Sequence, residues 1–118
     1  MPRMTHAEWL AYEQRRSRVV VNSDGVDDES ELHNAILEEC KTRGWIPFHG
    51  SMAHKTYRTE GEPDFLIFAD AGRVFAIECK RRRGKLSAAQ LGIIAWAEKL
   101  GHKIHVITSI EEFREIVK

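Results

Sequence analysis

The sequence predicts a single α/β domain in which helices flank a mixed β-sheet, with core elements in the order α-β-β-β-α-β and a last helix after them. Three observations lead to this fold class. Apolar residues recur at helical spacing behind good N-cap residues, two continuous apolar runs lie on either side of a tight turn, and the second run is followed by a helix and another apolar run. The length of 118 residues and the hydrophobic content of 42% fit one globular domain.

The first helix is expected over residues 29–43. Its apolar positions are Leu32, Ala35, Ile36 and Cys40. Asp28, followed three residues later by Glu31, fits a capping box, and Gly44 supplies the C-terminal end. Residues 45–48 are then expected to form a short strand, which Pro47 makes either an edge strand or a strand that ends there.

The next two strands are expected at residues 65–68 and 74–80, joined by a hairpin turn at residues 70–72. Both runs begin with continuously apolar residues. Strands of this kind are usually buried on both faces, so we expect both to be central strands that other elements cover on each side.

Ser87 opens the following helix, Gln90 completes a capping box with it, and Gly101 ends it. Residues 104–108 are expected to form a strand. The intervening helix makes a crossover connection, so this strand should run parallel to the strand before the helix. Ser109 then opens the last helix.

Residues 1–28 differ from the rest of the chain, and we expect them to form an N-terminal arm used for packing, a partner subunit or DNA, ahead of a domain at 29–118. No apolar run approaches the ~20 residues of a membrane-spanning helix, and the first residues lack the apolar stretch of a secretion signal. Two cysteines are too few for a disulfide framework, so a cytoplasmic location is expected.

Charge is balanced overall but clustered locally. The 18 basic and 18 acidic residues give a net charge of zero, which by itself does not indicate a nucleic-acid-binding protein. The densest basic run, Lys80-Arg81-Arg82-Arg83-Gly84-Lys85, follows directly on the expected strand at 74–80.

The residues with the clearest chemical potential lie where the central strands end. Asp64 precedes one strand, and Glu78 and Lys80 share one face at the end of its neighbour. A hairpin register that pairs the start of the first strand with the end of the second brings Asp64 beside Glu78. Two such carboxylates repel unless a cation lies between them, and oxygen ligands suit Mg²⁺ or Mn²⁺.

Three motifs in order resemble those of the PD-(D/E)xK nuclease superfamily, and most closely its virus-type replication-repair nuclease (VRR-NUC) branch. They are Gly61-Glu62-Pro63-Asp64, Glu78-Cys79-Lys80 and Leu86-Ser87-Ala88-Ala89-Gln90. The resemblance covers about residues 28–110, and the order of elements agrees with the α-β-β-β-α-β core of that superfamily. It implies a restriction-endonuclease-like fold and metal-dependent cleavage of phosphodiester bonds.

The resemblance also implies a role for individual residues. The metal ligands would be three carboxylates and one backbone carbonyl, those of Glu29, Asp64, Glu78 and Cys79. Lys80 would be the catalytic lysine, and Gln90 the helix residue that reaches the active site. The chain departs from the family at His33, where Gln is usual, and at Cys79, where a small apolar residue is common.

Each of these residues also has a purely structural interpretation. Glu29 and Glu31 can both act as capping or dipole residues, which leaves open which of them is the ligand. Gln90 completes a capping box without any catalytic role. The basic residues can be a solvated charge run, although their position favours contacts with phosphate. The expected nucleic-acid contacts are Arg81, Arg82, Arg83, Lys85, Lys55 and Arg58.

We therefore expect a Mg²⁺-dependent DNA endonuclease, with Mn²⁺ able to substitute. A short nuclease that engages two strands gains from two-fold symmetry, so a homodimer acting on branched DNA such as a four-way junction is expected, in a phage or bacterial context. A restriction or repair nuclease with another DNA substrate is the first alternative. The second is a DNA-binding module that keeps the nuclease fold but has little or no activity.

Overall fold

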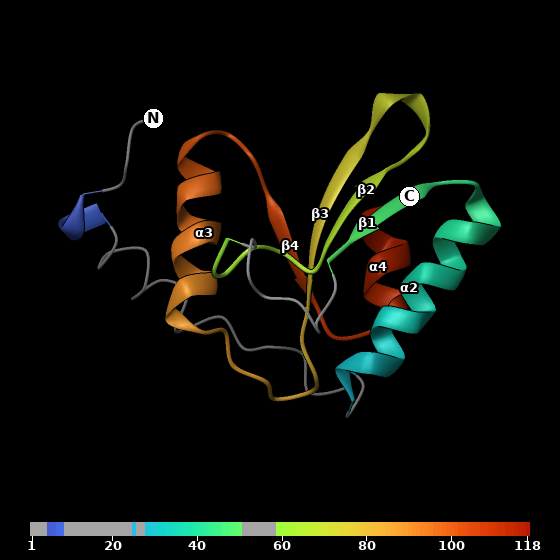
Figure 1. The fold of residues 1–118 in the computed structure, drawn as a ribbon, viewed down its shortest axis with the longest axis horizontal. Helices are drawn as coiled ribbons and strands as arrows, with labels where there is room; N and C mark the ends of the chain where they lie inside the picture. The colour runs from blue at the N-terminus through green and yellow to red at the C-terminus, as the bar shows by residue number, and fades with distance from the viewer. Residues whose placement is uncertain (1–4, 9–24, 26–27, 51–58) are drawn as a thin grey trace.

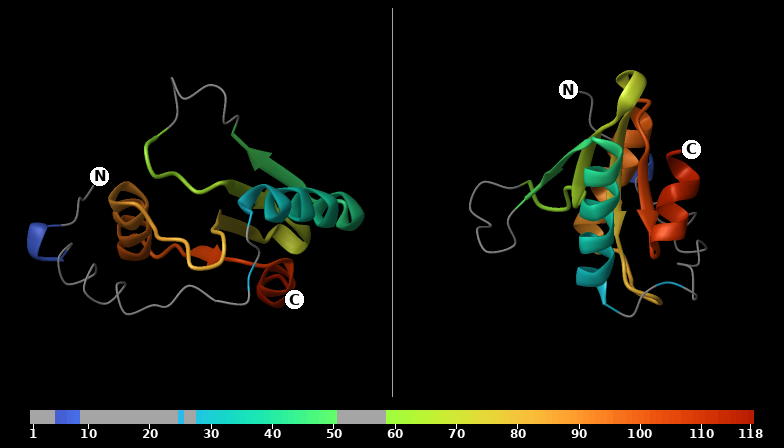
Figure 2. Two further views of the ribbon diagram at one scale, coloured as in Figure 1. Left: turned by 90° about the horizontal axis from the view of Figure 1, so that it is seen from below. Right: turned by 90° about the vertical axis from the view of Figure 1, so that its right-hand side faces the viewer.

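The protein was analysed as a computed structural model that describes residues 5–8, 25, 28–50 and 59–118. A mixed sheet runs through the middle of the fold, with α3 on one side and α2 and α4 on the other (Figures 1 and 2). The elements beyond the N-terminal residues are α2 (Glu29–Arg43), β1 (Ile46–His49), β2 (Phe65–Phe68), the short 3₁₀ turn η1 (Asp70–Gly72), β3 (Val74–Cys79), α3 (Ala88–Lys99), β4 (Ile104–Ile107) and α4 (Ile110–Ile116).

Helix α2 has the predicted bounds, but its N-cap differs in detail. The Asp28 side chain accepts a hydrogen bond from the backbone N–H of Ser30 at 2.9 Å, whereas the Glu31 N–H bonds to the backbone oxygen of Asp28 at 3.2 Å. The predicted capping box between Asp28 and Glu31 is therefore wrong, although Asp28 is the cap. Gly44 ends the helix with a φ of 76°, a left-handed conformation that glycine adopts without steric cost.

The sheet has the order β1-β2-β3-β4. The β1–β2 and β2–β3 pairs are antiparallel, and the β3–β4 pair is parallel, as the crossover through α3 predicts. Strand β1 lies at the edge, which is one of the two outcomes expected from Pro47. The backbone N–H of Trp45 bonds to the Cys40 oxygen at 2.9 Å, and the Trp45 side chain is buried. Trp45 is therefore held at the end of α2, and β1 begins one residue later than expected.

The main core lies between the sheet and the pair α2 and α4. Its fully buried members include Leu32, Ile36, Cys40, Phe65, Ile67, Ile77, Cys79, Ile107 and Phe113. A smaller core lies on the other face, where Ile94 and Ala95 of α3 pack against Ile104 and Val106 of β4. The periodic apolar positions of α2 thus pack where the sequence predicted.

Strands β2 and β3 are both central, as expected, but the expectation that they are covered on both faces is wrong for β2 and for the start of β3. Helix α3 packs on β4, so it leaves the other half of its sheet face open. The uncovered side chains are 41–56% exposed and come from three strands: Ile46, Phe48, Leu66, Phe68 and Val74. The strand registers place them side by side, because Ile46 pairs with Phe68 and Phe68 with Val74. We call these five residues the bare sheet face.

Part of the N-terminal arm falls within the described residues. Glu8 forms an ion pair with Lys99 at the end of α3, with a distance of 3.0 Å between Oε2 and Nζ. The remainder of the predicted arm lies outside the described residues, as do Lys55 and Arg58. None of the helices in the described segments has the length and apolar character needed to span a bilayer.

Candidate functional site

The register of the β2–β3 hairpin determines where the candidate site forms. Phe65 pairs with Ile77, so Asp64 and Glu78 occupy the next pair of positions at the end of the hairpin. This is the juxtaposition that the sequence predicted. Glu78 lies on the face of the sheet that carries Leu66 and Phe68, whereas Asp64 lies in the bend before β2 and its side chain reaches His33 of α2.

Asp64 is held against the end of β3. Its Oδ2 accepts a hydrogen bond from the backbone N–H of Cys79 at 2.8 Å and lies 3.5 Å from Nε2 of His33. Burial alone would raise the pKa of Asp64, but the nearby His33 ring and the Cys79 N–H outweigh it, so the pKa is lowered. Asp64 is therefore an ionised carboxylate at a fixed position.

Glu78 is in the opposite electrostatic situation. It is only 2% exposed, and its Oε1 accepts a hydrogen bond from Nε2 of Gln90 at 2.8 Å. Burial, the negative charge of Asp64 and that of Glu29 raise the pKa of Glu78 to about 9, although the positive charge of Lys80 opposes this rise. Without a cation, Glu78 is consequently protonated at neutral pH.

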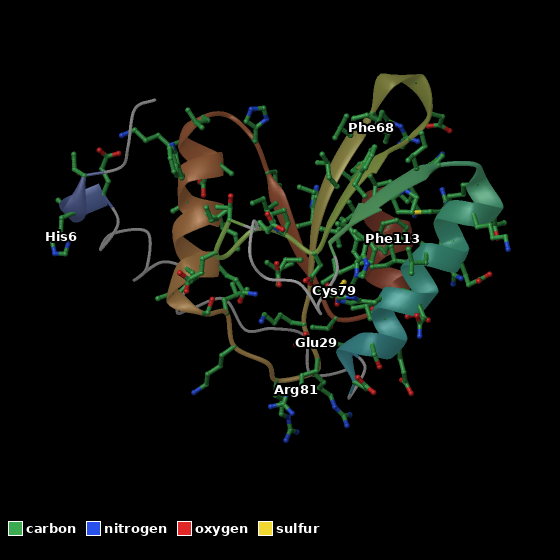
Figure 3. All side chains as sticks on the ribbon, in the orientation of Figure 1. His6, Glu29, Phe68, Cys79, Arg81 and Phe113 are labelled. Atoms are coloured by element: carbon green, nitrogen blue, oxygen red, sulfur yellow. The ribbon has the colours of Figure 1, made fainter. Side chains whose placement is uncertain are left out.

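Glu29 approaches the same place from the first turn of α2. Its Oε1 lies 3.4 Å from the backbone N–H of Arg81, just beyond the end of β3. Figure 3 shows Glu29 and Arg81 near each other below this end of the sheet, with Cys79 above them. Glu31 is exposed. Of the two candidate acids in this helix, Glu29 is thus the one placed beside the other carboxylates.

Gln90 caps α3 and also contacts Glu78, so both interpretations of this residue are compatible with its position. Its Oε1 accepts from the Ser87 N–H at 2.9 Å while the Ser87 Oγ accepts from the Gln90 N–H at 3.1 Å, which completes the capping box. With Oε1 held by the cap, the amide NH₂ is directed to Glu78. Gly61 allows the preceding loop to approach here, because a Cβ at this position would lie 2.3 Å from the Ala89 oxygen.

Two substitutions at Gln90 should separate these roles. Gln90→Glu keeps an oxygen for the Ser87 N–H but turns a carboxylate toward Glu78, whereas Gln90→Ala loses the cap and the contact together. At low pH we expect the helix content and the thermal stability of Gln90→Glu to be close to those of the unmodified protein. Both variants should lower the cleavage rate by about 10–100-fold, the usual effect of losing a partner that orients a metal ligand. Circular dichroism and single-turnover cleavage measure the two effects, and an unchanged cleavage rate in both variants would limit Gln90 to capping.

The basic run leaves β3 directly at the site. Arg81, Arg82, Arg83 and Lys85 are exposed, and the Gly84 N–H bonds to the Arg81 oxygen at 2.8 Å, which closes a turn. Arg83 has a φ of 62° in this turn, a conformation that costs a non-glycine residue about 1 kcal/mol or more. The Arg81 backbone N–H lies 3.4 Å from Oε1 of Glu29, so the basic run begins beside the candidate site, and its contacts with the phosphates of a substrate stay a prediction.

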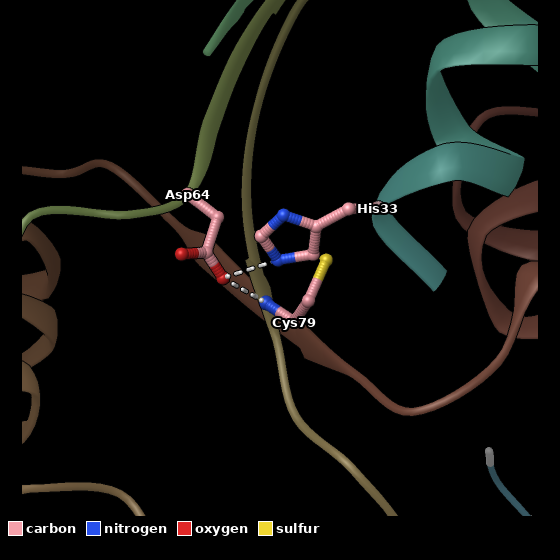
Figure 4. Close-up of side chains that lie close together, drawn as sticks. All are labelled: His33, Asp64 and Cys79. Atoms are coloured by element: carbon pink, nitrogen blue, oxygen red, sulfur yellow. Dashed lines mark hydrogen bonds and ion pairs between the residues drawn. The ribbon is translucent and has the colours of Figure 1, made fainter. Parts of the chain in front are cut away.

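His33 belongs to the site although the sequence gave it no role there. Its Nδ1 lies 3.1 Å from Nε2 of His49 in β1, and the His49 ring stacks on Phe65 with 4.6 Å between centroids. His33, Asp64 and Cys79 come together from α2, the start of β2 and the end of β3 (Figure 4). The sequence held one sign that His33 is unusual, because the family resemblance led us to expect Gln at this position.

The carboxylates at this end of the sheet are of the chemical kind that a hard divalent cation prefers, but among the described residues the donor atoms that lie within 4.8 Å of one another are those of His33, Asp64 and Cys79. Glu29, Asp64 and Glu78 supply oxygen donors, and Glu78 carries a raised pKa chiefly because it is buried among like charges. A cation between them would compensate the repulsion that keeps Glu78 protonated. Carboxylates, a lysine and an amide donor at one place are the groups that bind a divalent cation and a phosphate in other proteins.

The fold was also compared with known proteins. A solved structure entitled "VRR_NUC domain" superposes with a TM-score of 0.61 at 20% sequence identity, over 75% of this chain and 92% of that chain. Neither protein-family models nor curated protein sequences gave a match. At this identity the likeness establishes the fold, so the restriction-endonuclease-like α/β class expected from the motifs is confirmed.

Proposed function

We propose that this chain, with the fold of a VRR_NUC domain, is a metal-dependent DNA endonuclease that hydrolyses phosphodiester bonds. The observation that carries the proposal is the convergence of Asp64 and Glu78 at the end of the β2–β3 hairpin, with Lys80 close enough to lower the pKa of Glu78. Fold likeness alone does not establish an activity, so the chemistry of this site is the argument.

In this proposal Glu29, Asp64, Glu78 and the backbone carbonyl of Cys79 would hold Mg²⁺, and Mn²⁺ would substitute. The bound ion would supply Lewis-acid chemistry and lower the pKa of water. Asp64 is held by the Cys79 N–H, and Glu78 is oriented by Gln90, so both carboxylates are preorganised. Lys80 places a positive charge beside them, where it can neutralise charge that develops on the phosphate.

The exposed cations after β3 would position the DNA backbone. A neutral protein has little long-range attraction for DNA, so binding should rest on this local patch and weaken steeply with salt. We expect contacts with phosphates from Arg81, Arg82, Arg83 and Lys85, and from Lys55 and Arg58 in the preceding loop. Both described cysteines are free thiols, which agrees with the proposed cytoplasmic location.

The experiment that tests the function is cleavage of a panel of DNA substrates: duplex, nicked, flapped and four-way-junction DNA of the same sequence. Mg²⁺, Mn²⁺ and a chelator are the three conditions. Cleavage that requires the metal supports a nuclease, and symmetric cutting of the junction alone supports a junction resolvase. Binding without any cleavage in either metal would contradict the proposal and favour an inactive DNA-binding module.

We propose a homodimer formed through the bare sheet face. Its five side chains offer about 400 Å² of apolar surface if each contributes nearly half of the area of a fully buried large side chain. That is about half of the ~800 Å² that each partner of a typical interface buries, so polar rim contacts would supply the rest. Pro47 hinders pairing along the β1 edge, which favours face-to-face packing of two sheets.

The dimer also has a consequence for the substrate. Glu78 lies on the same sheet face as Leu66 and Phe68, so a second copy packed on this face would give an assembly with two sites related by a two-fold axis. Two sites related by a two-fold axis suit a substrate with two-fold symmetry, such as a four-way junction.

Leu66→Glu should disrupt this dimer. A charge placed in the middle of the bare sheet face opposes burial of that face, so we expect a monomer in sedimentation or light scattering at concentrations where the unmodified chain is a dimer. Leu100→Glu is the matched control, because Leu100 is equally exposed at 41% but lies after α3 and outside that face. A dimer that persists in Leu66→Glu, or dissociates in Leu100→Glu, would exclude this interface.

A further inference from the structure

A second set of metal ligands overlaps the carboxylate site. One donor atom from each of His33, Asp64 and Cys79 lies within 4.8 Å of the other two. Cys79 is fully buried, while the side chains of His33 and Asp64 are 14% and 16% exposed. The three come from separate elements, and Figure 4 shows the Asp64 carboxylate directed at the His33 ring and at the backbone N–H of Cys79.

The hydrogen bonding of His33 leaves one ring nitrogen facing this cluster. Nδ1 lies 3.1 Å from Nε2 of His49, whereas Nε2 is buried and has no hydrogen-bond partner among the described residues. It lies 3.5 Å from Oδ2 of Asp64, and that oxygen already accepts from the Cys79 N–H. A cation bound between Nε2 and the Asp64 carboxylate would take the place of a proton on that nitrogen.

The donor set indicates which cations fit. Imidazole, thiolate and carboxylate together are the ligands of Zn²⁺ and of chemically similar ions such as Co²⁺, whereas Mg²⁺ prefers oxygen donors. Tetrahedral Zn²⁺ with bonds of about 2.0–2.3 Å needs donors less than about 4 Å apart, so the three side chains must close by about 1 Å. Solvent could supply a fourth ligand, because Asp64 and His33 are partly exposed.

We propose that His33, Asp64 and Cys79 form a binding site for a thiophilic divalent cation such as Zn²⁺. This site differs from the oxygen-donor site in two of its three side chains but shares Asp64 with it. Binding of Zn²⁺ through Asp64 and the Cys79 thiol therefore competes with Mg²⁺ for the same carboxylate. The binding rests on the geometry above, and the resulting inhibition of cleavage rests on the proposed function.

The test uses the full chain with Co²⁺ as a spectroscopic probe and Zn²⁺ as competitor. We expect Co²⁺ to give a thiolate-to-metal charge-transfer absorption that Zn²⁺ removes. Cys79→Ala should abolish this absorption, and His33→Gln should weaken Zn²⁺ binding by about tenfold or more, measured by titration calorimetry. Cys40→Ala is the matched control, because Cys40 is an equally buried free thiol in α2 and its removal should leave the absorption unchanged. Circular dichroism confirms that each variant is folded.

The results separate this proposal from the proposed function. An absence of the charge-transfer absorption in the unmodified chain, its persistence in Cys79→Ala or its loss in folded Cys40→Ala would overturn the thiophilic site, whether or not the chain cleaves DNA. If the site binds Zn²⁺ as expected and no DNA is cut in Mg²⁺, the proposed function fails and the site stands. Where cleavage is present, Zn²⁺ should inhibit it at about tenfold lower concentration in the unmodified chain than in His33→Gln.

Discussion

Replacement of Glu78 by Gln is expected to abolish cleavage and, at the same time, to stabilise the metal-free protein. Glutamine keeps an oxygen that can accept from Gln90 but carries no charge for a metal, so the cleavage rate should fall by at least about 10²-fold. The gain in stability follows from the buried position of Glu78, which makes its negative charge unfavourable beside Asp64.

The pKa of Glu78 determines how the stability difference between the two proteins changes with pH. The pKa of Glu78 is about 9 in the folded protein and close to 4.5 in the unfolded chain, so between these values the folded protein holds the additional proton. Its contribution to stability is complete below about pH 4.5 and is lost progressively as the pH rises toward 9. Because Gln does not ionise, the free energy of unfolding of Glu78→Gln should exceed that of the unmodified protein by about 1 kcal/mol or more at pH 8, and the two should converge at acidic pH.

Thermal unfolding with a chelator present, at several pH values, measures this difference. Glu38→Gln is the control, since Glu38 is an exposed carboxylate on α2 away from the site and its removal should leave the pH profile unchanged. Addition of Mg²⁺ should reverse the ranking, because only the unmodified protein gains stability from metal binding through Glu78. Equal stability of the two proteins at every pH would show that the pKa of Glu78 is not raised in the folded protein.

Removal of the Lys80 side chain should have the largest effect on the chemical step among the basic residues. Its backbone N–H bonds to the Ile107 oxygen at 2.9 Å, so its position is fixed by the β3–β4 pairing even though its side chain lies beyond the strand. We expect Lys80→Ala to lower the single-turnover rate by about 10²–10³-fold with little change in DNA affinity.

Lys85→Ala is the matched comparison, because it removes a lysine from the same basic run at an exposed position. This variant should keep the single-turnover rate at saturating protein but weaken DNA binding and reduce the salt dependence by about one phosphate contact. Binding is measured by anisotropy over a series of salt concentrations. A similar loss of rate in both variants would assign Lys80 to general electrostatic attraction instead of to the reacting phosphate.

The local rules of the sequence predicted most of the fold. The helical spacing and Gly44 located α2, Pro47 indicated an edge or terminated strand, and the crossover pattern predicted the parallel pair. The covering of β2 was not predictable in the same way. A continuous apolar run states only that each side chain is apolar, whereas the coverage of Leu66 and Phe68 depends on where α3 packs across the sheet.

The candidate site was likewise predictable only in part from the sequence. The alternation of side chains and the turn at residues 70–72 were enough to bring Asp64 and Glu78 together, because both lie on one hairpin. His33 depends on how α2 is placed against β1 and β2, and a sequence does not specify such a distance between elements. Gln90 was assigned two competing roles, one from the capping box and one from the family resemblance, and the structure shows that each end of its amide has a different partner.

The hydrogen bond between the Asp64 carboxylate and the Cys79 N–H has a consequence for how this protein tolerates change. The backbone pairing of β2 with β3 ends at Phe65, and the next contact between the two segments is made by the Asp64 side chain. The position of this carboxylate is therefore set by β3 and not by the backbone that precedes Asp64. Insertions or exchanges in the segment between β1 and Gly61 should leave the spacing of the acidic residues intact. That segment is therefore a suitable place to graft new recognition loops onto an unchanged scaffold.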